Sequence, residues 1–242
     1  MKNYLLRLFL LLCLTSCSFS GPNFRRLIND LLKDYEPYER PVINESDAVD
    51  VSYGLTYRSL IDLDVNSGVL TSNVWQHIQW KDSHLQWSPS DYGNITSIRL
   101  PSKRVWIPDL IPYNAADYQH VDPYKHFTRV VIKSDGMCTW VPPMILKTTC
   151  EVDDTQFVHN CAIKMGSWIY DGFKMNVTLQ SPEANLSSYV KNKKWELKGI
   201  PAVRNETYYS CCSEPYVNLT YNVKLNKRGY TFKGFLHSIK GN

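Results

Sequence analysis

Two adjacent cysteines, Cys211 and Cys212, are the residues whose spacing says most about chemistry, and Tyr208, Tyr209 and Tyr216 flank them. Neighbouring Cα atoms lie about 3.8 Å apart, less than the roughly 4.4–6.8 Å of an ordinary disulfide, so a bridge between these cysteines closes a strained ring. Strain of this kind gathers at functional sites. The pattern therefore favours a vicinal disulfide at a functional loop tip. Separate bridges from the two cysteines to other partners are the alternative.

The remaining cysteines indicate structural disulfides rather than metal or redox chemistry. Cys13 and Cys17 fall in an expected leader, and the odd number left predicts two disulfides and one free thiol. Cys150 and Cys161 enclose a mostly polar loop, and we expect them to bridge two strands and to leave Cys138 unpaired. No Cys-x-x-Cys or His-x-x-x-His spacing occurs, so the sequence indicates neither a metal site nor a cofactor.

Trp75 is a second candidate for ligand contact. The segment 73–80 is typical of a strand, in which successive side chains point to opposite faces. Val74, Ile78 and Trp80 share one face, which we expect to be buried. Trp75 lies on the other face and is expected to point away from the core. An exposed tryptophan is more often a packing or interface residue, so ligand contact remains one of two interpretations.

The composition excludes several classes of protein. Hydrophobic residues make up 43% and charged residues 21% of the 242 residues, so neither a disordered chain nor a multi-pass membrane protein fits. The formal net charge is +4, and no basic run is longer than Lys193-Lys194, which argues against nucleic acid as a partner. Aromatic residues are abundant, with 16 Tyr, 7 Trp and 8 Phe, and can line a binding site.

The elements that must position these residues are mostly strands. Apolar residues at helical spacing predict one short helix over 24–32, after which the period changes to two and predicts a long strand over 49–63. Further strand-like runs occur at 69–80, 98–107, 127–133, 137–147, 163–165, 172–180, 195–198 and 215–236. We expect an all-β fold: a single twisted, Greek-key-like β-sandwich of about ten strands, with a short N-terminal α-helix.

The N-terminal segment predicts export. Residues 1–20 combine Lys2, an apolar stretch and small residues in the order of a signal peptide, and the apolar stretch is too short for a confident membrane span. We expect one secreted, extracellular domain over 21–242. Asn-x-Ser/Thr acceptors, usable only in an exported chain, make these residues glycosylation candidates: Asn44, Asn94, Asn176, Asn185, Asn205 and Asn218.

Three motifs together resemble a known family. They are Trp-x-Pro-Asp…Tyr-Asn-Ala-Ala-Asp at 106–117, Cys…Gly-Ser-Trp-x-Tyr at 161–170 and Tyr-Ser-Cys-Cys-Ser-Glu-Pro-Tyr at 209–216. The whole mature chain resembles the ligand-binding domain of nicotinic acetylcholine receptor alpha subunits. A secreted chain without transmembrane helices is more similar still to the soluble acetylcholine-binding proteins of invertebrates. The resemblance implies five copies in a ring, with ligand between neighbours.

The resemblance also implies two half-sites for small cationic ligands, acetylcholine and nicotine-like amines. The principal face would use Tyr113, Trp168, Tyr209, Tyr216 and a Cys211–Cys212 bridge. The complementary face would use Trp75, Val131, Thr139 and Val141. Because one chain carries both faces, a homopentamer can build complete sites. Trp168 is expected to supply the main cation–π surface.

The sequence departs from the receptor pattern at three places. One is Ile169, at a position usually held by Ser or Thr, and the other two bear on coupling to a channel. Receptors have thirteen residues in the loop corresponding to 150–161, including an aromatic-Pro-Phe-Asp segment; this loop has ten and lacks the segment. Asn218 stands where alpha subunits have an aspartate that partners a lysine and a tyrosine, corresponding to Lys164 and Tyr209. Both departures weaken the expected coupling to a channel.

Other functions remain as alternatives. The nearest is the extracellular domain of a nicotinic-type ligand-gated channel subunit. A secreted glycan-processing enzyme would need a carboxylate pair, and the sequence singles none out. An adhesion sandwich would not need adjacent cysteines. We therefore expect a binding protein rather than an enzyme.

Overall fold

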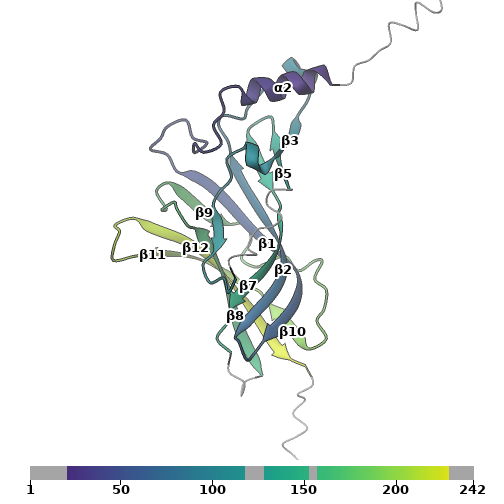
Figure 1. Ribbon diagram of the computed structural model, residues 1–242, viewed down its shortest axis with the longest axis vertical. Coiled ribbons are helices and arrows are strands. Elements are labelled where there is room, and N and C mark those ends of the chain that lie inside the picture. Colours follow the sequence, from purple (N-terminus) through teal and green to yellow (C-terminus); the bar gives the residue numbers. More distant parts are fainter. Residues whose placement is uncertain (1–20, 118–127, 153–156, 229–242) are drawn as a thin grey trace, which may run out of the picture.

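The computed structural model describes residues 21–117, 128–152 and 157–228, and it shows a twisted sandwich of two sheets below one helix (Figure 1). This confirms the predicted fold class. The described residues form twelve strands, two more than the sequence suggested. The expected signal peptide, 1–20, and the end of the last strand-like run, 229–236, lie outside the described residues. No described helix is long and apolar enough to cross a membrane.

Helix α2 (Pro22–Leu32) lies at one end of the sandwich. Proline in its first turn suits a helix start, because the missing N–H has no partner inside the helix there. Leu27 is fully buried, and Ile28 and Leu31 pack against the core. The predicted amphipathic helix is therefore confirmed, and its apolar side closes that end of the sandwich.

The first sheet holds the two long strands β1 (Val49–Asp64) and β2 (Val69–Lys81), which pair antiparallel. Its order is β3-β5-β6-β2-β1-β9, and β7 also pairs with β2. The other members are β3 (Ser97–Pro101), β5 (Arg129–Lys133), β6 (Met137–Trp140), β7 (Pro143–Thr149) and β9 (Met175–Leu179). Strand β9 pairs with β1 in parallel, as a crossover from the second sheet.

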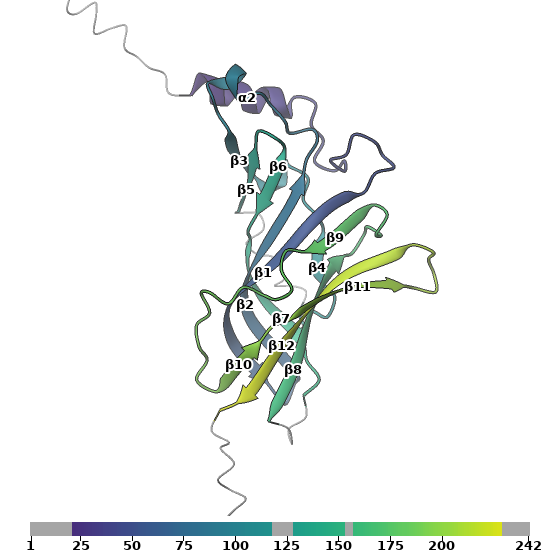
Figure 2. The ribbon, with the colours of Figure 1, turned by 180° about the vertical axis from the view of Figure 1, so that it is seen from behind.

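The second sheet has the order β10-β12-β8-β4, with β11 paired to β12. Its strands are β4 (Leu110–Pro112), β8 (Val158–Ser167), β10 (Trp195–Gly199), β11 (Ala202–Tyr208) and β12 (Pro215–Lys227). The β11–β12 hairpin projects sideways from the body in both views (Figures 1 and 2). Its tip is therefore free to meet something outside the chain.

Several predicted boundaries were wrong for identifiable reasons. The run 98–107 ends as a strand at Pro101 and continues as the short 3₁₀ helix η2 (Ser102–Arg104). The run 137–147 is two strands, since Val141 and Pro142 separate β6 from β7 and proline has no N–H for the ladder. Strands β4 and β11 were not predicted. The former is three residues long, and the latter is mostly polar and half-exposed.

Large aromatic side chains fill the core between the sheets, and some of them form hydrogen bonds there, whereas the polar atoms of Trp80 and Tyr221 have no hydrogen-bond partner within the described part of the chain. The Tyr57 hydroxyl lies 2.8 Å from the Ser72 hydroxyl, and Trp140 Nε1 donates to Thr128 Oγ1 over 2.8 Å. Trp80 is only 1% exposed and packs edge-on against Trp106, with ring centroids 5.9 Å apart. Alternation along β2 thus places Trp80 in the core, as the sequence predicted.

We predict that Trp80→Ala destabilises the fold by about 3–5 kcal/mol, because it removes a large buried aromatic side chain. Trp168→Ala is the matched control: that side chain is 68% exposed, and its loss should change the free energy of unfolding by less than about 0.5 kcal/mol. Urea denaturation followed by circular dichroism measures both. Equal losses would contradict the different burial of the two rings.

Candidate functional site

The tip of the β11–β12 hairpin carries the adjacent cysteines, Cys211 and Cys212, joined as a disulfide. Tyr209 and Tyr216 lie on either side of this bridge, and their rings meet edge to face with centroids 5.5 Å apart. Tyr208 is exposed beside them. These residues are close together in the sequence, which therefore predicted that they lie near one another. In the structure they lie at the outer end of the hairpin.

Trp168 follows the end of β8 and is held in an exposed position by Asp109. One oxygen of the Asp109 carboxylate accepts hydrogen bonds from the backbone N–H groups of Trp168 (2.9 Å) and Ile169 (2.8 Å), and the other accepts from the Ser167 hydroxyl (2.7 Å). The Ser167 oxygen in turn accepts from the Tyr170 N–H over 2.7 Å. This network fixes the backbone on both sides of Trp168 while the ring itself stays in solvent.

Tyr113, just after β4, completes the aromatic group. Its ring lies edge-on to Trp168 with centroids 6.4 Å apart, and its hydroxyl donates to the Ser167 carbonyl. Glycine is required at 166, because a Cβ there would lie 2.5 Å from the Tyr113 ring carbon Cζ. Burial, followed by the nearby Tyr209 and Asp109, raises the pKa of Tyr113 to about 12. The hydroxyl therefore remains a hydrogen-bond donor at neutral pH.

A surface hollow of about 650 Å³ lies between this aromatic group and the hairpin. Its lining is mainly polar outside the two tyrosines: Tyr113, Asn114, Lys164, Asn205, Glu206, Thr207, Tyr209, Asn218 and Thr220. Asn218 faces Asn205 across the β11–β12 pair, and the Asn205 amide donates to Asn218 Oδ1 over 3.3 Å. Lys164, Tyr209 and Asn218 thus line the same hollow, as the family pattern implied. In this chain, the neutral amide of Asn218 takes the place of the aspartate of alpha subunits.

The second group of candidate residues lies on the other sheet. Trp75 is 39% exposed on the outward face of β2, and Val131, Thr139 and Val141 are half-buried. Val131 pairs directly with Thr139 across β5 and β6, and the Gln79 side chain donates to Thr139 Oγ1 over 3.3 Å. These residues form one surface of the seven-stranded sheet, separate from the sheet that carries Trp168 and the hairpin.

Comparison with known proteins identifies the family of this chain. Residues 24–229 match the neurotransmitter-gated ion-channel ligand binding domain. The chain belongs to that family. Acetylcholine receptor subunit alpha-like 2 of Drosophila melanogaster is 37% identical over 237 residues, 93% of this chain. Neuronal acetylcholine receptor subunit alpha-2 of Homo sapiens is 39% identical over 199 residues, 81% of this chain.

The chain is shorter than these relatives. The match covers 40% of the Drosophila protein and 37% of the human one. Acetylcholine receptor subunit alpha-L1 of Schistocerca gregaria is 36% identical over 221 residues, which are 86% of this chain and 39% of that protein. The family and its receptor-like ligand-binding domain are therefore established, and the resemblance drawn from the three sequence motifs is confirmed.

A disulfide closes the loop after which the Cys-loop receptors are named. Cys150 and Cys161 form a disulfide with a Cα–Cα distance of 4.9 Å, which joins the end of β7 to β8. Residues 153–156, inside this loop, lie outside the described part of the chain. Cys138 is buried and unbridged, and burial raises the pKa of its thiol.

The six glycosylation candidates of the ligand-binding domain differ in accessibility. Asn44, Asn94, Asn185 and Asn205 are exposed. Asn176 and Asn218 are half-buried, and their side-chain amides donate to Asp50 Oδ1 over 2.9 Å and to Thr207 Oγ1 over 3.4 Å respectively. The fold therefore engages these two side chains in contacts that a glycan would disturb.

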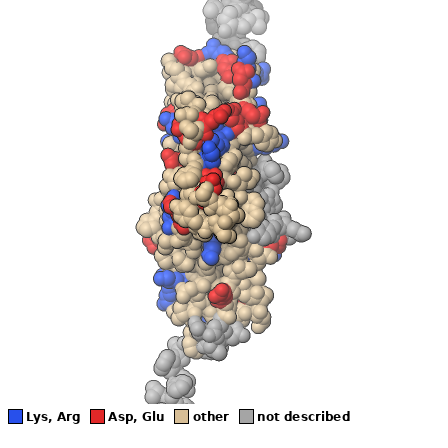
Figure 3. Space-filling model, turned by 90° about the vertical axis from the view of Figure 1, so that its left-hand side faces the viewer, with Lys and Arg blue, Asp and Glu red and all other residues tan. Residues whose placement is uncertain are grey.

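The surface charge is mixed. Figure 3 views the side from which the hairpin projects in Figure 1; acidic and basic side chains are interspersed, mainly in the upper half, on a largely uncharged face. No group of three or more His, Cys, Asp or Glu suited to hold a metal occurs among residues 21–117, 128–152 and 157–228.

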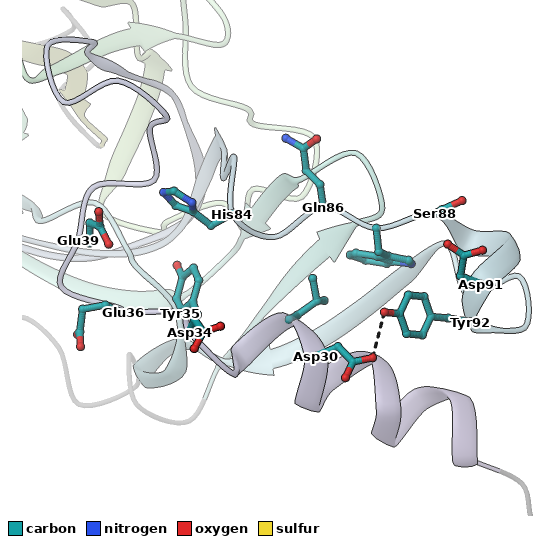
Figure 4. A pocket seen from close by; sticks show the side chains of 12 residues that line it. Asp30, Asp34, Tyr35, Glu36, Glu39, His84, Gln86, Ser88, Asp91 and Tyr92 are labelled. Atoms are coloured by element: carbon teal, nitrogen blue, oxygen red, sulfur yellow. Dashed lines mark hydrogen bonds between the residues drawn. The ribbon is translucent and has the colours of Figure 1, made fainter.

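A second hollow, of about 470 Å³, lies beside helix α2 and contains none of the candidate residues (Figure 4). Its lining is rich in carboxylates, and one of them, Asp30, accepts a hydrogen bond from Tyr92 over 3.1 Å. The aromatic group around Trp168 and the hairpin tip, not this acidic hollow, corresponds to the predicted site.

Sequence patterns did not reveal that Asp109 holds the Trp168 segment, although its motif was noted. Its hydrogen-bond partners lie 58–60 residues away in the chain, so no local spacing connects them. The available signal was an aspartate directly after a proline at the start of a strand, since a short carboxylate there can accept backbone N–H groups.

We predict that Asp109→Ala loosens the Trp168 segment. Hydrogen–deuterium exchange of the Trp168 and Ile169 amides should accelerate about tenfold or more, because a hydrogen bond to a charged group contributes about 1.5–3 kcal/mol. Asp109→Asn keeps one acceptor oxygen and should show a smaller increase. Asp62→Ala removes an exposed carboxylate of β1 and should leave both amides unchanged. Unchanged exchange in Asp109→Ala would contradict this role.

Proposed function

We propose that the protein binds small cationic ligands, acetylcholine or nicotine-like amines, in aromatic sites between neighbouring copies of a secreted homopentamer. The observation that carries this proposal is the exposed ring of Trp168, which Asp109 fixes beside Tyr113. A large ring held in solvent beside another aromatic ring can contact a partner. Tyr209, Tyr216 and the Cys211–Cys212 bridge provide the opposite wall on the hairpin.

The chemistry of these side chains suits a quaternary ammonium. Such a group carries a permanent charge and has no N–H, so its head cannot form ordinary hydrogen bonds to a carboxylate. Electron-rich ring faces attract it by roughly 0.5–2 kcal/mol each without a buried anion. Protonated amines such as nicotine can in addition donate to a backbone carbonyl. The hairpin tip, which projects from the body, can act as a lid that closes over the ligand.

The position of the two half-sites supports assembly. Trp168 and the hairpin belong to one sheet, whereas Trp75, Val131 and Thr139 belong to the other. One chain carries both groups on different sheets, so identical copies arranged head to tail in a closed ring bring them together at every junction. The names of the relatives, which are acetylcholine receptor subunits, support the choice of ligand.

A second candidate is the extracellular domain of a ligand-gated channel subunit. The relatives are longer, and the matched region is about two fifths of each, which favours this alternative. Ligand chemistry and ring assembly are the same in both candidates. Coding sequence for four apolar spans downstream of Asn242 would decide for the channel subunit.

We further propose that glycans occupy the exposed acceptors Asn44, Asn94, Asn185 and Asn205 in preference to Asn176 and Asn218. The four favoured side chains are exposed, whereas Asn176 and Asn218 are half-buried and donate to Asp50 and Thr207. The Asn205 amide also donates, to Asn218 and Thr220, so a glycan there would replace those two contacts. Asn205 lines the hollow beside Tyr209, so a glycan there would stand next to the ligand site.

The binding proposal predicts a graded loss of affinity. Trp168→Ala should weaken acetylcholine or nicotine binding by about 2 kcal/mol or more, roughly thirtyfold, because it removes the main cation–π face. Trp75→Ala should weaken binding less, since that ring meets the ligand from the neighbouring copy. Tyr38→Ala, which removes a ring that is exposed near helix α2, should bind like the wild type. Calorimetric titration gives the affinities.

Light scattering of each deglycosylated variant checks the assembly in the same samples. All four proteins should have the mass of five subunits. A stable wild-type monomer at micromolar concentration would contradict the homopentamer. Wild-type affinity in both tryptophan variants would contradict the aromatic site, whatever the assembly.

A further inference from the structure

Arg58 stacks on Trp75, and neither the proposed site nor the core accounts for this contact. Its guanidinium carbon lies 4.4 Å from the centroid of the Trp75 ring, within the range of a cation–π interaction. The two residues come from β1 and β2, which pair and lie side by side in Figures 1 and 2. A cation of the protein itself therefore covers one of the rings proposed to meet a cationic ligand.

A β-bulge directs Arg58 towards this ring. Along the β1–β2 pair, Tyr57 lies opposite Val74 and Ser59 lies opposite Asn73, so Arg58 is the extra residue on its strand. Bulges re-aim side chains and are frequent next to functional sites. The contact with Trp75 thus follows from the backbone arrangement as well as from the side chain.

The charge of Arg58 is available to the site. Among the residues that the structure describes, no carboxylate forms an ion pair with Arg58. The planar guanidinium stacks flat on an aromatic face and keeps its N–H donors at the edge. A second cation approaching Trp75 would meet a like charge and a ring face that is already occupied.

We infer that Arg58 determines specificity at the complementary half-site, an inference that rests on the proposed function. It reserves the site for ligands with one cationic head, which binds at Trp168. The favoured ligand carries a hydrogen-bond acceptor at its other end, such as the ester of acetylcholine, to which the guanidinium can donate. Ligands with a quaternary ammonium at both ends are disfavoured, because their second head would meet Arg58.

Calorimetric titration of acetylcholine and of decamethonium, a bis-quaternary dication, tests this inference. Arg58→Gln should increase decamethonium affinity about tenfold, the equivalent of one cation–π contact, and should lower the affinity for acetylcholine, whose ester loses a charged donor. Arg58→Met, a second neutral replacement, should reproduce the gain. Arg58→Lys keeps the charge and should retain most of the discrimination against the dication.

Two further variants separate a local effect from a general one. In a Trp75→Ala background, Arg58→Gln should give a clearly smaller gain, because the like charge is still removed but the ring that it would free is absent. Arg25→Gln removes one positive charge from helix α2 and should leave both affinities unchanged.

The possible results distinguish failure of the inference from failure of the proposed function. A selective gain for the dication that depends on Trp75 supports the inference. An unchanged ratio of the two affinities in both neutral variants, or the same gain without Trp75, overturns it while the proposed function stands. A wild-type protein that binds neither ligand overturns the proposed function itself, and the inference with it.

Discussion

An aromatic ring that must face solvent has to be held there by something other than its own burial. Trp168 is 68% exposed, and the Asp109 carboxylate holds its backbone through hydrogen bonds to two successive N–H groups and to the Ser167 hydroxyl. This arrangement requires β4 to lie beside the end of β8, where Leu110 pairs with Ser167. The second sheet therefore serves to bring a carboxylate to the segment that carries the ring.

The first sheet keeps its exposed tryptophan, Trp75, on the surface in a different way. One face of β2 packs into the core through residues such as Trp80, so alternation obliges Trp75 to face outward. The neighbouring strand then supplies Arg58 through a bulge and covers that ring with a guanidinium. The environments of the two exposed tryptophans thus differ: the Trp168 ring is open to solvent, whereas the Trp75 ring is covered by the Arg58 guanidinium.

Sequence patterns predicted the structural features that are determined by residues close together in the chain. Period-two alternation gave β1 and β2 and the opposite burial of Trp75 and Trp80, and the family motifs marked the aromatic residues. What the sequence did not reveal depends on long-range placement. Asp109 acts on residues about sixty positions away, and the Arg58 bulge appears only when β1 is paired with β2. The polar strand β11 was missed because its stabilisation comes from pairing with β12 rather than from burial.

The central claim is that ring faces hold a positive charge, and a ligand without that charge tests it most directly. In 3,3-dimethylbutyl acetate, carbon replaces the ammonium nitrogen of acetylcholine, so the shape is kept and the charge is lost. Competition against acetylcholine on the wild-type protein measures the difference. The account predicts that the neutral ester binds at least about thirtyfold more weakly, as two or more cation–π contacts require. Equal affinity for the two esters would show a merely apolar cleft and contradict it.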